Sequence, residues 1–267
     1  MAYGDYGTGK TRLVGSAALV PDMRDVLFID AEAGDLTIST EDQVDYAESA
    51  KKYIDVVSVN TFKQLARVQE FLKLHCTLRD AEGEEAEKKL KDLEERLMPG
   101  TFDADKPARR YRTAIIDSLS EAEQFSMYQL LGISDRTRLD EEVASPEWAE
   151  YKRNHSQILR TIRAFRDLPM HILMTAGAAY IQDENKRMLW QPALTGRLAK
   201  QCQGFMDVVG YMFVTADETS QNKKIHNLQV QPSPRINAKC RFSNFKMSGW
   251  QNPDIRMILK SVGLMEA

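Results

Sequence analysis

The first residues of the chain form a glycine-rich stretch whose residue types and spacing suit the binding of phosphate groups. It consists of Gly4, Asp5, Tyr6, Gly7, Thr8, Gly9, Lys10 and Thr11, and it fits G-x-x-x-x-G-K-[ST] at every position. Glycines allow successive backbone N–H groups to turn inward toward phosphate oxygens, and a following helix adds the positive end of its dipole. Lys10 is expected to reach the β- and γ-phosphates, and the Thr11 hydroxyl to hold Mg²⁺. The sequence therefore predicts a site for ATP with Mg²⁺; the alternative is a chance glycine-rich turn.

A second candidate ligand lies at the end of an apolar segment in the middle of the chain. Residues 113–118 read Thr-Ala-Ile-Ile-Asp-Ser, a pattern typical of a buried strand that ends in an acid. A carboxylate at this place accepts hydrogen bonds from Mg²⁺-bound water and faces Thr11. The pattern is weak alone, but the phosphate loop in the same chain strengthens it. We therefore assign Asp117 to both the nucleotide and the metal.

The elements that position these residues are expected to alternate between buried strands and helices. Strands are predicted over 26–30, 55–59, 113–118 and 171–176, and helices over 11–19, 62–72, 119–131 and 146–166. Parallel sheets of this kind bind ligands at the carboxyl ends of their strands. Only three residues precede the phosphate loop, so its strand is either very short or truncated.

The last third of the chain predicts a different kind of sheet. Residues 177–200 are rich in turn formers, and 207–216, 224–231 and 236–242 have the pattern of strands joined by hairpins. A closing helix over 254–262 is followed by Gly263. We expect one α/β domain over residues 1–267, with a mainly parallel sheet flanked by helices and antiparallel strands at its C-terminal end.

A charged segment interrupts this order at about residues 79–112. Acidic and basic residues four positions apart, such as Glu84 with Lys88 and Glu87 with Lys91, favour a solvated helix up to residue 97. Its leucines form only a thin apolar seam. We interpret the segment as an exposed helical insertion, with a partner-binding helix as the alternative.

Composition excludes several classes of protein. Charged residues make up 28% and hydrophobic residues 43% of the 267-residue chain, as in ordinary globular proteins. No apolar run reaches the ~18 residues of a membrane span, and the start lacks a signal-peptide pattern. Three dispersed cysteines suggest neither a disulfide framework nor a zinc site, so the cytosol is the default location. A net charge of −3 argues against a uniformly basic coat for nucleic acid, but not against a local basic groove.

The order of these motifs resembles the core of RecA-type recombinases. The phosphate loop, residues 28–32, residues 115–118 and the late strands with Lys239-Cys240-Arg241 carry the resemblance, which covers most of the chain except the charged segment. More closely, the chain resembles the phage-encoded RecA-like single-strand annealing ATPases of the Sak group. The resemblance implies an ATPase of phage or bacterial recombination that binds single-stranded DNA, self-associates into a ring or filament, and works beside a single-strand DNA-binding protein.

The resemblance also implies roles for three further residues. Glu32, two positions after the acid of its strand, matches the residue that orients the attacking water, although it could instead cap a helix or pair with a surface base. Lys239 and Arg241 match the paired cations that are lent to a neighbour's nucleotide. Two positions apart on a strand, they would share a face. The alternative for this pair is a solvated edge strand.

DNA contact in this family comes from two loops, which correspond to residues 132–145 and 177–200. Candidate contacts in them are cations and one aromatic residue: Arg136, Arg138, Lys186, Arg187, Trp190, Arg197 and Lys200. Acidic residues are interspersed, so solvated loops are the alternative. Thr175, at the end of a predicted strand, is either a γ-phosphate sensor or a core hydrogen-bonding residue.

Three departures weaken the match, and two other functions remain open. The strand before the phosphate loop is nearly absent, no N-terminal polymerisation segment is seen, and residues 175–177 lack the amide-bearing sensor of recombinases. A small-molecule phosphotransferase would need an arginine-rich lid, which is not evident. A loader or packaging accessory that uses nucleotide only as a switch would not need Glu32.

Overall fold

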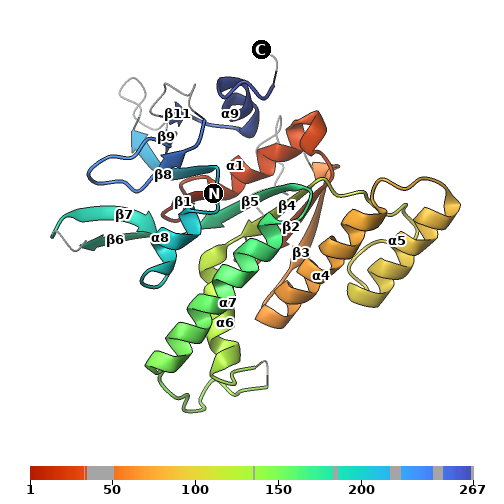
Figure 1. Ribbon diagram of the computed structural model, residues 1–267, viewed down its shortest axis with the longest axis horizontal. Helices are drawn as coiled ribbons and strands as arrows, with labels where there is room; N and C mark the ends of the chain where they lie inside the picture. Colours follow the sequence, from red (N-terminus) through yellow and green to blue (C-terminus); the bar gives the residue numbers. More distant parts are fainter. Residues whose placement is uncertain are drawn as a thin grey trace.

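The computed structural model describes residues 1–32, 34, 51–134, 136–182, 186–216, 224–242 and 249–265. Its centre is a nine-stranded sheet with the order β11-β9-β8-β1-β5-β4-β2-β3, in which β10 also pairs with β8 (Figure 1). None of the helices in the described ranges has the length and apolar character needed to cross a membrane.

Six strands of the sheet are parallel and three are antiparallel. The parallel strands are β1 (Ala2–Gly4), β2 (Val26–Asp30), β3 (Ile54–Ser58), β4 (Thr113–Asp117), β5 (His171–Ala176) and β8 (Val208–Ala216). The antiparallel strands are β9 (Lys224–Gln229), β10 (Lys239–Cys240) and β11 (Gly249–Gln251). The expected parallel sheet with antiparallel C-terminal strands is confirmed. The strand before the phosphate loop is only three residues long, yet it lies between β5 and β8 at the centre of the sheet.

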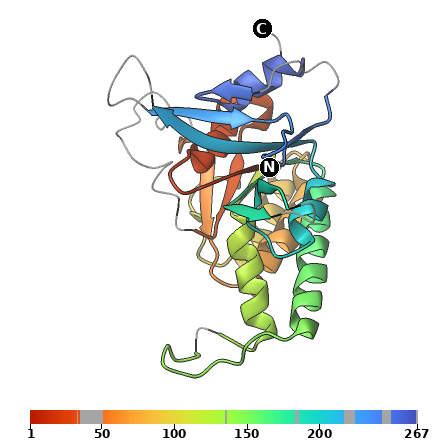
Figure 2. The same cartoon turned by 90° about the vertical axis from the view of Figure 1, so that its left-hand side faces the viewer.

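Helices cover both faces of the sheet. They are α1 (Lys10–Gly15), α4 (Phe62–Leu78), α5 (Glu84–Leu97), α6 (Leu119–Leu130), α7 (Trp148–Arg166), α8 (Leu198–Gln203) and α9 (Ile255–Ser261), with short 3₁₀ turns at Ser16–Leu19 and Pro21–Met23. The helix predicted over 11–19 therefore ends early and continues as a 3₁₀ turn. In Figure 2, α6 and α7 extend well beyond the sheet as a two-helix arm.

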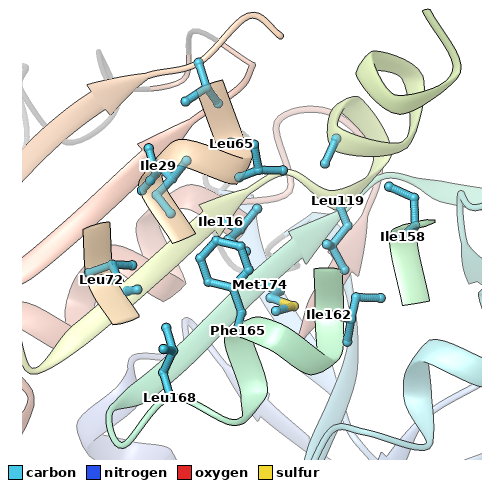
Figure 3. Packing of buried hydrophobic residues seen from close by; sticks show 14 of the residues in the cluster. Ile29, Leu65, Leu72, Ile116, Leu119, Ile158, Ile162, Phe165, Leu168 and Met174 are labelled. Carbon is cyan, nitrogen blue, oxygen red and sulfur yellow. The ribbon is translucent and has the colours of Figure 1, made fainter. Parts of the chain in front are cut away.

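The alternation of side chains along the strands produces the two core layers. Leu27, Ile29 and Ile116 lie on one face, where they pack with α4, α6 and α7 in the large core drawn in Figure 3. Phe28 and Ile115 lie on the other face, in a smaller core with α1. Strands that are buried on both faces read as continuous apolar runs, which is why these strands were legible in the sequence.

The segment over residues 177–200 differs from the expected turn-rich loop. It forms a separate hairpin of β6 (Ala178–Gln182) and β7 (Met188–Pro192), followed by α8. Tyr180 and Trp190 lie directly opposite each other in this hairpin, with ring centroids 4.8 Å apart, and such cross-strand aromatic pairs stabilise hairpins. Residues 183–185, at its turn, lie outside the described part.

The strand predicted over 236–242 is also shorter than expected. Only Lys239–Cys240 pairs with β8, because the residues before it bond to β7 instead. Trp190 N–H donates to the Arg235 carbonyl at 2.7 Å, and Asn237 N–H donates to the Trp190 carbonyl at 2.9 Å.

The charged segment folds back onto the body of the protein through α5. Leu90 and Leu93 are buried, so the thin apolar seam packs inward. The ion pairs that form are Lys89–Glu85 at 2.6 Å and Lys91–Glu94 at 3.3 Å. Glu87 does not follow the expected pairing, because its carboxylate accepts the Ala108 backbone N–H at 2.6 Å. That the segment is an insertion stays a prediction.

Candidate functional site

The phosphate loop joins β1 to α1 at the carboxyl end of the central strand. Gly4 must be a glycine, since a Cβ there would lie 2.4 Å from the Met212 carbonyl oxygen of the neighbouring β8. Thr8 closes the loop by donating from its hydroxyl to the Asp5 carbonyl at 2.8 Å. Asp5, Tyr6 and Gly7 are exposed. The loop is thus anchored by the sheet at its start while its apex stays open to solvent.

Lys10 is buried at this loop without a counter-charge among the described residues. Its side chain is 7% exposed, and Nζ donates to the Gly4 and Asp5 carbonyl oxygens at 3.0 Å each. Within the described ranges, no carboxylate lies within ion-pair distance of Lys10. Buried charges are normally paired. A buried ammonium beside two neutral oxygens is therefore suited to an anionic ligand.

Asp117 lies at the end of β4, fully buried and between two hydroxyl groups. Thr11 donates to its Oδ2 at 2.7 Å, and Thr175 donates to its Oδ1. Burial raises the pKa of Asp117 above its ordinary value, while the hydrogen bonds from Thr175 and Thr11 oppose that shift. The structure brings together Thr11 and Asp117 as the sequence predicted, and it gives Thr175 a hydrogen-bonding role on the candidate metal-site carboxylate.

Glu32 reaches the same edge of the sheet from β2. Its carboxylate accepts a hydrogen bond from Ser118, the residue directly after Asp117, and its backbone N–H donates to Asp30 Oδ1 at 3.2 Å. Burial and the nearby Glu32 charge raise the pKa of Glu121 in the first turn of α6. Glu32 therefore lies beside the Asp117 strand and not on a remote surface.

A cavity of about 240 Å³ adjoins the phosphate loop on the side of α1. Its wall includes Gly9 and Arg12 from the loop and helix, His226 from β9, and Asn252 and Asp254 from the C-terminal segment. Polar side chains and backbone line a space that begins beside the predicted phosphate site. The cavity has the position expected for the nucleoside that a bound triphosphate carries.

Comparison with known proteins agrees with this geometry. A family model described as an AAA domain matches residues 1–242. The chain belongs to the AAA domain family. It is therefore a P-loop ATPase domain, and the expected fold class is confirmed. No curated protein matches the sequence.

Solved structures that resemble this AAA domain share little sequence with it. One solved ATPase domain has 13% identity and a TM-score of 0.44, over 94% of this chain and 78% of that one. The RadB recombinase has 15% identity and a TM-score of 0.39, over 94% and 83%. The flagellar accessory protein FlaH of Methanocaldococcus jannaschii has 10% identity and a TM-score of 0.38, over 85% and 75%.

Lys239 and Arg241 lie away from the phosphate loop of their own AAA domain. Lys239 is opposite Val209 near the start of β8, whereas the loop continues from the far end of the parallel strand β1. Lys239 Nζ donates to the Gln203 carbonyl at 3.0 Å, and Arg241 pairs with Asp207 at 2.9 Å. Partial burial and the adjacent Arg241 lower the pKa of Lys239. Both cations reach the same spot at the end of α8, so they share a face as predicted.

The candidate DNA residues of the first loop lie at the tip of the α6–α7 arm. Arg136 and Arg138 are exposed there, and Arg138 pairs with Asp140 at 2.7 Å. The arm tip also exposes apolar side chains, with Leu139 fully exposed and Trp148 73% exposed. This group of cations is separate from the second one.

The candidates of the second loop lie on and after the β6–β7 hairpin. Lys186 and Arg187 are at its turn and exposed, Trp190 is on β7, and Arg197 and Lys200 are exposed around the start of α8. Tyr180, Trp190, Tyr211 and Phe213 form an aromatic stack from the hairpin across β8, with centroids 4.8, 5.4 and 5.6 Å apart in that order. Tyr180, at its outer end, is 47% exposed.

The first turn of α6 connects the hairpin to the nucleotide site. Gly177 N–H donates to Ser120 Oγ at 3.0 Å, and this hydroxyl donates to the Ala193 carbonyl at 2.9 Å. Glu123 accepts the Thr195 N–H with both carboxylate oxygens at 3.1 Å. Burial raises the pKa of Glu123, and the bonds from Thr195 oppose this. The helix that begins at the Asp117–Ser118 end of β4 thus holds both ends of the hairpin.

Several of these contacts could not be found from the sequence. His226, which contacts the Thr8 carbonyl, had no local motif, and Tyr180, Tyr211 and Phe213 looked like ordinary strand residues. A usable signal was the alternation of Tyr180 with its neighbours in a segment that we expected to be a loop. Ser120 and Glu123 read as helix residues only, since their partners lie more than 50 residues away.

Proposed function

We propose that this AAA domain is a Mg²⁺-dependent ATPase that binds single-stranded DNA and promotes annealing or strand pairing in phage or bacterial recombination. The observation that carries the nucleotide part is the buried Lys10 ammonium, which has no carboxylate partner among the described residues and lies beside the Thr11–Asp117 pair. The sequence motifs resemble those of the Sak group of annealing proteins, which supports the recombination assignment.

The donor set at the loop fits Mg²⁺. Thr11 and Asp117 supply a hydroxyl and a carboxylate oxygen that already touch, and Mg²⁺ prefers such oxygen ligands, together with water and substrate phosphates, to a complete protein cage. In agreement, the described part of the chain contains no group of three or more His, Cys, Asp or Glu side chains arranged around one point. When bound, the ion would neutralise charge on the phosphate oxygens. Lys10 would hold the same phosphates from within the loop.

Glu32 is proposed to orient the water that attacks the γ-phosphate. Phosphoryl transfer depends mainly on positioning and on electrostatic stabilisation, so a held carboxylate is sufficient for this role. Ser118 donates to Glu32 and fixes the carboxylate beside the Asp117 strand. This fixed position favours hydrolysis over use of nucleotide only as a switch.

The β6–β7 hairpin is proposed to carry single-stranded DNA. Bases of any sequence can stack on exposed aromatic rings, and nearby cations can follow the phosphate backbone. The hairpin combines both features: Tyr180 is exposed at the end of the aromatic stack, and Lys186 lies at the turn. The salt bridge of Arg138 to Asp140 leaves the arm tip less suited to this role.

Self-association is proposed to complete the active site. Lys239 and Arg241 lie at the end of β8 remote from their own loop, so a neighbouring subunit's nucleotide is the one that they would serve. A cation supplied in trans stabilises transition-state charge and makes hydrolysis depend on assembly. Hydrolysis per subunit should then rise with protein concentration.

Fluorescence anisotropy with labelled oligonucleotides tests the DNA part directly. Single-stranded DNA should bind more tightly than duplex, and affinity should fall as salt rises, because backbone contacts release counterions. A Lys186→Ala/Arg187→Ala double variant should bind more weakly across all sequences, while Arg136→Ala serves as the matched control on the arm. Wild-type protein that binds no single-stranded DNA, with or without ATP and Mg²⁺, would exclude the DNA part of the proposal.

A further inference from the structure

His226 is a side chain from the C-terminal strands that touches the phosphate loop. Its Nδ1 lies 2.9 Å from the Thr8 carbonyl oxygen, 218 residues away in sequence. A carbonyl can only accept, so Nδ1 carries the hydrogen and donates it. The ring also packs against Gly9, where an added Cβ would lie 3.1 Å from Nδ1. Gly9 has φ of 90°, so its backbone and this contact both require glycine.

The peptide plane between Thr8 and Gly9 gives this contact a consequence. In a trans peptide the C=O and the N–H point in opposite directions. The hydrogen bond from His226 holds the Thr8 carbonyl toward β9 and therefore directs the Gly9 N–H away from β9. In a phosphate loop, inward-pointing N–H groups are the ones that bind the anion.

A segment outside the family match holds His226 in place. Asn252 N–H donates to the His226 carbonyl at 2.6 Å, and Asn252 Oδ1 accepts the His226 N–H at 3.1 Å. The same segment reaches α1, because Ile255 N–H donates to Ser16 Oγ at 2.8 Å. The family model ends at residue 242. The segment from 249 onward therefore braces a loop that begins at residue 4.

We infer that His226 is a positioning residue of the phosphate loop: it sets the Thr8–Gly9 peptide for phosphate binding, and the segment with Asn252 braces it. The inference rests on the proposed nucleotide function and goes further by assigning part of the affinity to the C-terminal strands. It needs no contact between His226 and the reacting atoms.

Two substitutions separate hydrogen bonding from packing. In His226→Asn, the side-chain amide nitrogen is bonded to Cγ as Nδ1 is in histidine, so a donor can be kept; His226→Leu keeps bulk and loses the donor. By isothermal titration with ATP and Mg²⁺, we expect His226→Leu to bind about three- to tenfold more weakly, the effect of one hydrogen bond, and His226→Asn to stay closer to wild type. His171→Leu, at the far end of β5, is the control and should bind as wild type.

The outcomes discriminate between the possible failures. His226→Leu with wild-type affinity, or equal losses in the Leu and Asn variants, would overturn the inference while leaving nucleotide binding intact. Wild-type protein that binds no ATP would overturn the proposed function and the inference together. Should His226→Leu not fold, Asn252→Ala replaces it: a weaker affinity for ATP supports the brace, and an unchanged affinity overturns it.

Discussion

The nucleotide site and the β6–β7 hairpin are built in opposite ways. At the site, Lys10 is 7% exposed and Asp117 fully buried, and each is already hydrogen-bonded to protein groups. On the hairpin, Tyr180 is 47% exposed and the cations lie at a turn. Charge stabilisation in phosphoryl transfer requires fixed groups shielded from water. A surface that receives a flexible strand instead needs open aromatic faces and mobile cations.

The first turn of α6 joins these two regions. Ser118 contacts Glu32 at the site, and Ser120 and Glu123 hold the two ends of the hairpin. The chemical end and the contact end therefore meet within little more than one turn of the same helix. The two regions have different physical properties but a common support.

The largest effect is expected at the chemical end from Glu32→Gln. Removing the charge keeps the shape of the side chain but loses the group that orients water, so the hydrolysis rate should fall about 10²- to 10⁴-fold. Nucleotide affinity should remain, as measured by titration with ATP. Glu121→Gln, on the adjacent turn, is the control. A Glu32→Gln variant that hydrolyses ATP at the wild-type rate would remove Glu32 from the site.

Lys10→Ala should affect both binding and turnover. It removes the charge that the loop directs at the phosphates, and loss of one such donor typically costs about 10²- to 10³-fold in rate. Lys63→Ala, an exposed position on α4, should leave both unchanged. Unchanged hydrolysis by a folded Lys10→Ala variant would show that the nucleotide does not use this loop.

A pH effect on stability should come from neither region but from the core beneath α4. His75 is 1% exposed, and burial lowers its pKa to about 4. Between pH 6.5 and 4 the unfolded chain binds more protons at this residue, so its contribution is complete above pH 6.5 and is lost as pH falls toward 4. The loss is about 3 kcal/mol in the free energy of unfolding.

Urea unfolding at a series of pH values checks this effect. The raised pKa values of Asp117 and Glu123 act in the opposite direction, so the useful quantity is the difference between wild type and His75→Gln. The variant should show a flatter acid limb. Parallel curves for the two proteins from pH 7 to 4 would contradict the assignment.

The smallest effect is expected at the contact end from Tyr180→Ala. Loss of one base-stacking ring should weaken single-stranded DNA binding by roughly 1–3 kcal/mol, without changing basal ATP hydrolysis. Tyr128→Ala, an exposed tyrosine on α6, is the control. Equal DNA affinity of the Tyr180 variant and wild type would move the DNA away from the hairpin.

The sequence predicted the chemical end better than the contact end, for a physical reason. Glycine spacing, an apolar run that ends in Asp117 and the strand over 26–30 are local patterns, and the parallel sheet then brings their ends together. The hairpin was read as a loop because its stability depends on the Tyr180–Trp190 pair and on a stack that continues onto Tyr211. His226 at the loop depends on pairing across 218 residues, which no local pattern records.

ATP hydrolysis with and without single-stranded DNA, in wild type and in Ser120→Ala, tests the link between the two regions most directly. The account predicts that single-stranded DNA accelerates hydrolysis by wild type and by Ser156→Ala, an exposed control on α7. Ser120→Ala should keep basal hydrolysis and lose most of the acceleration, because the hairpin is then released from α6. Full acceleration in Ser120→Ala, or none in wild type that binds both ATP and DNA, would contradict it.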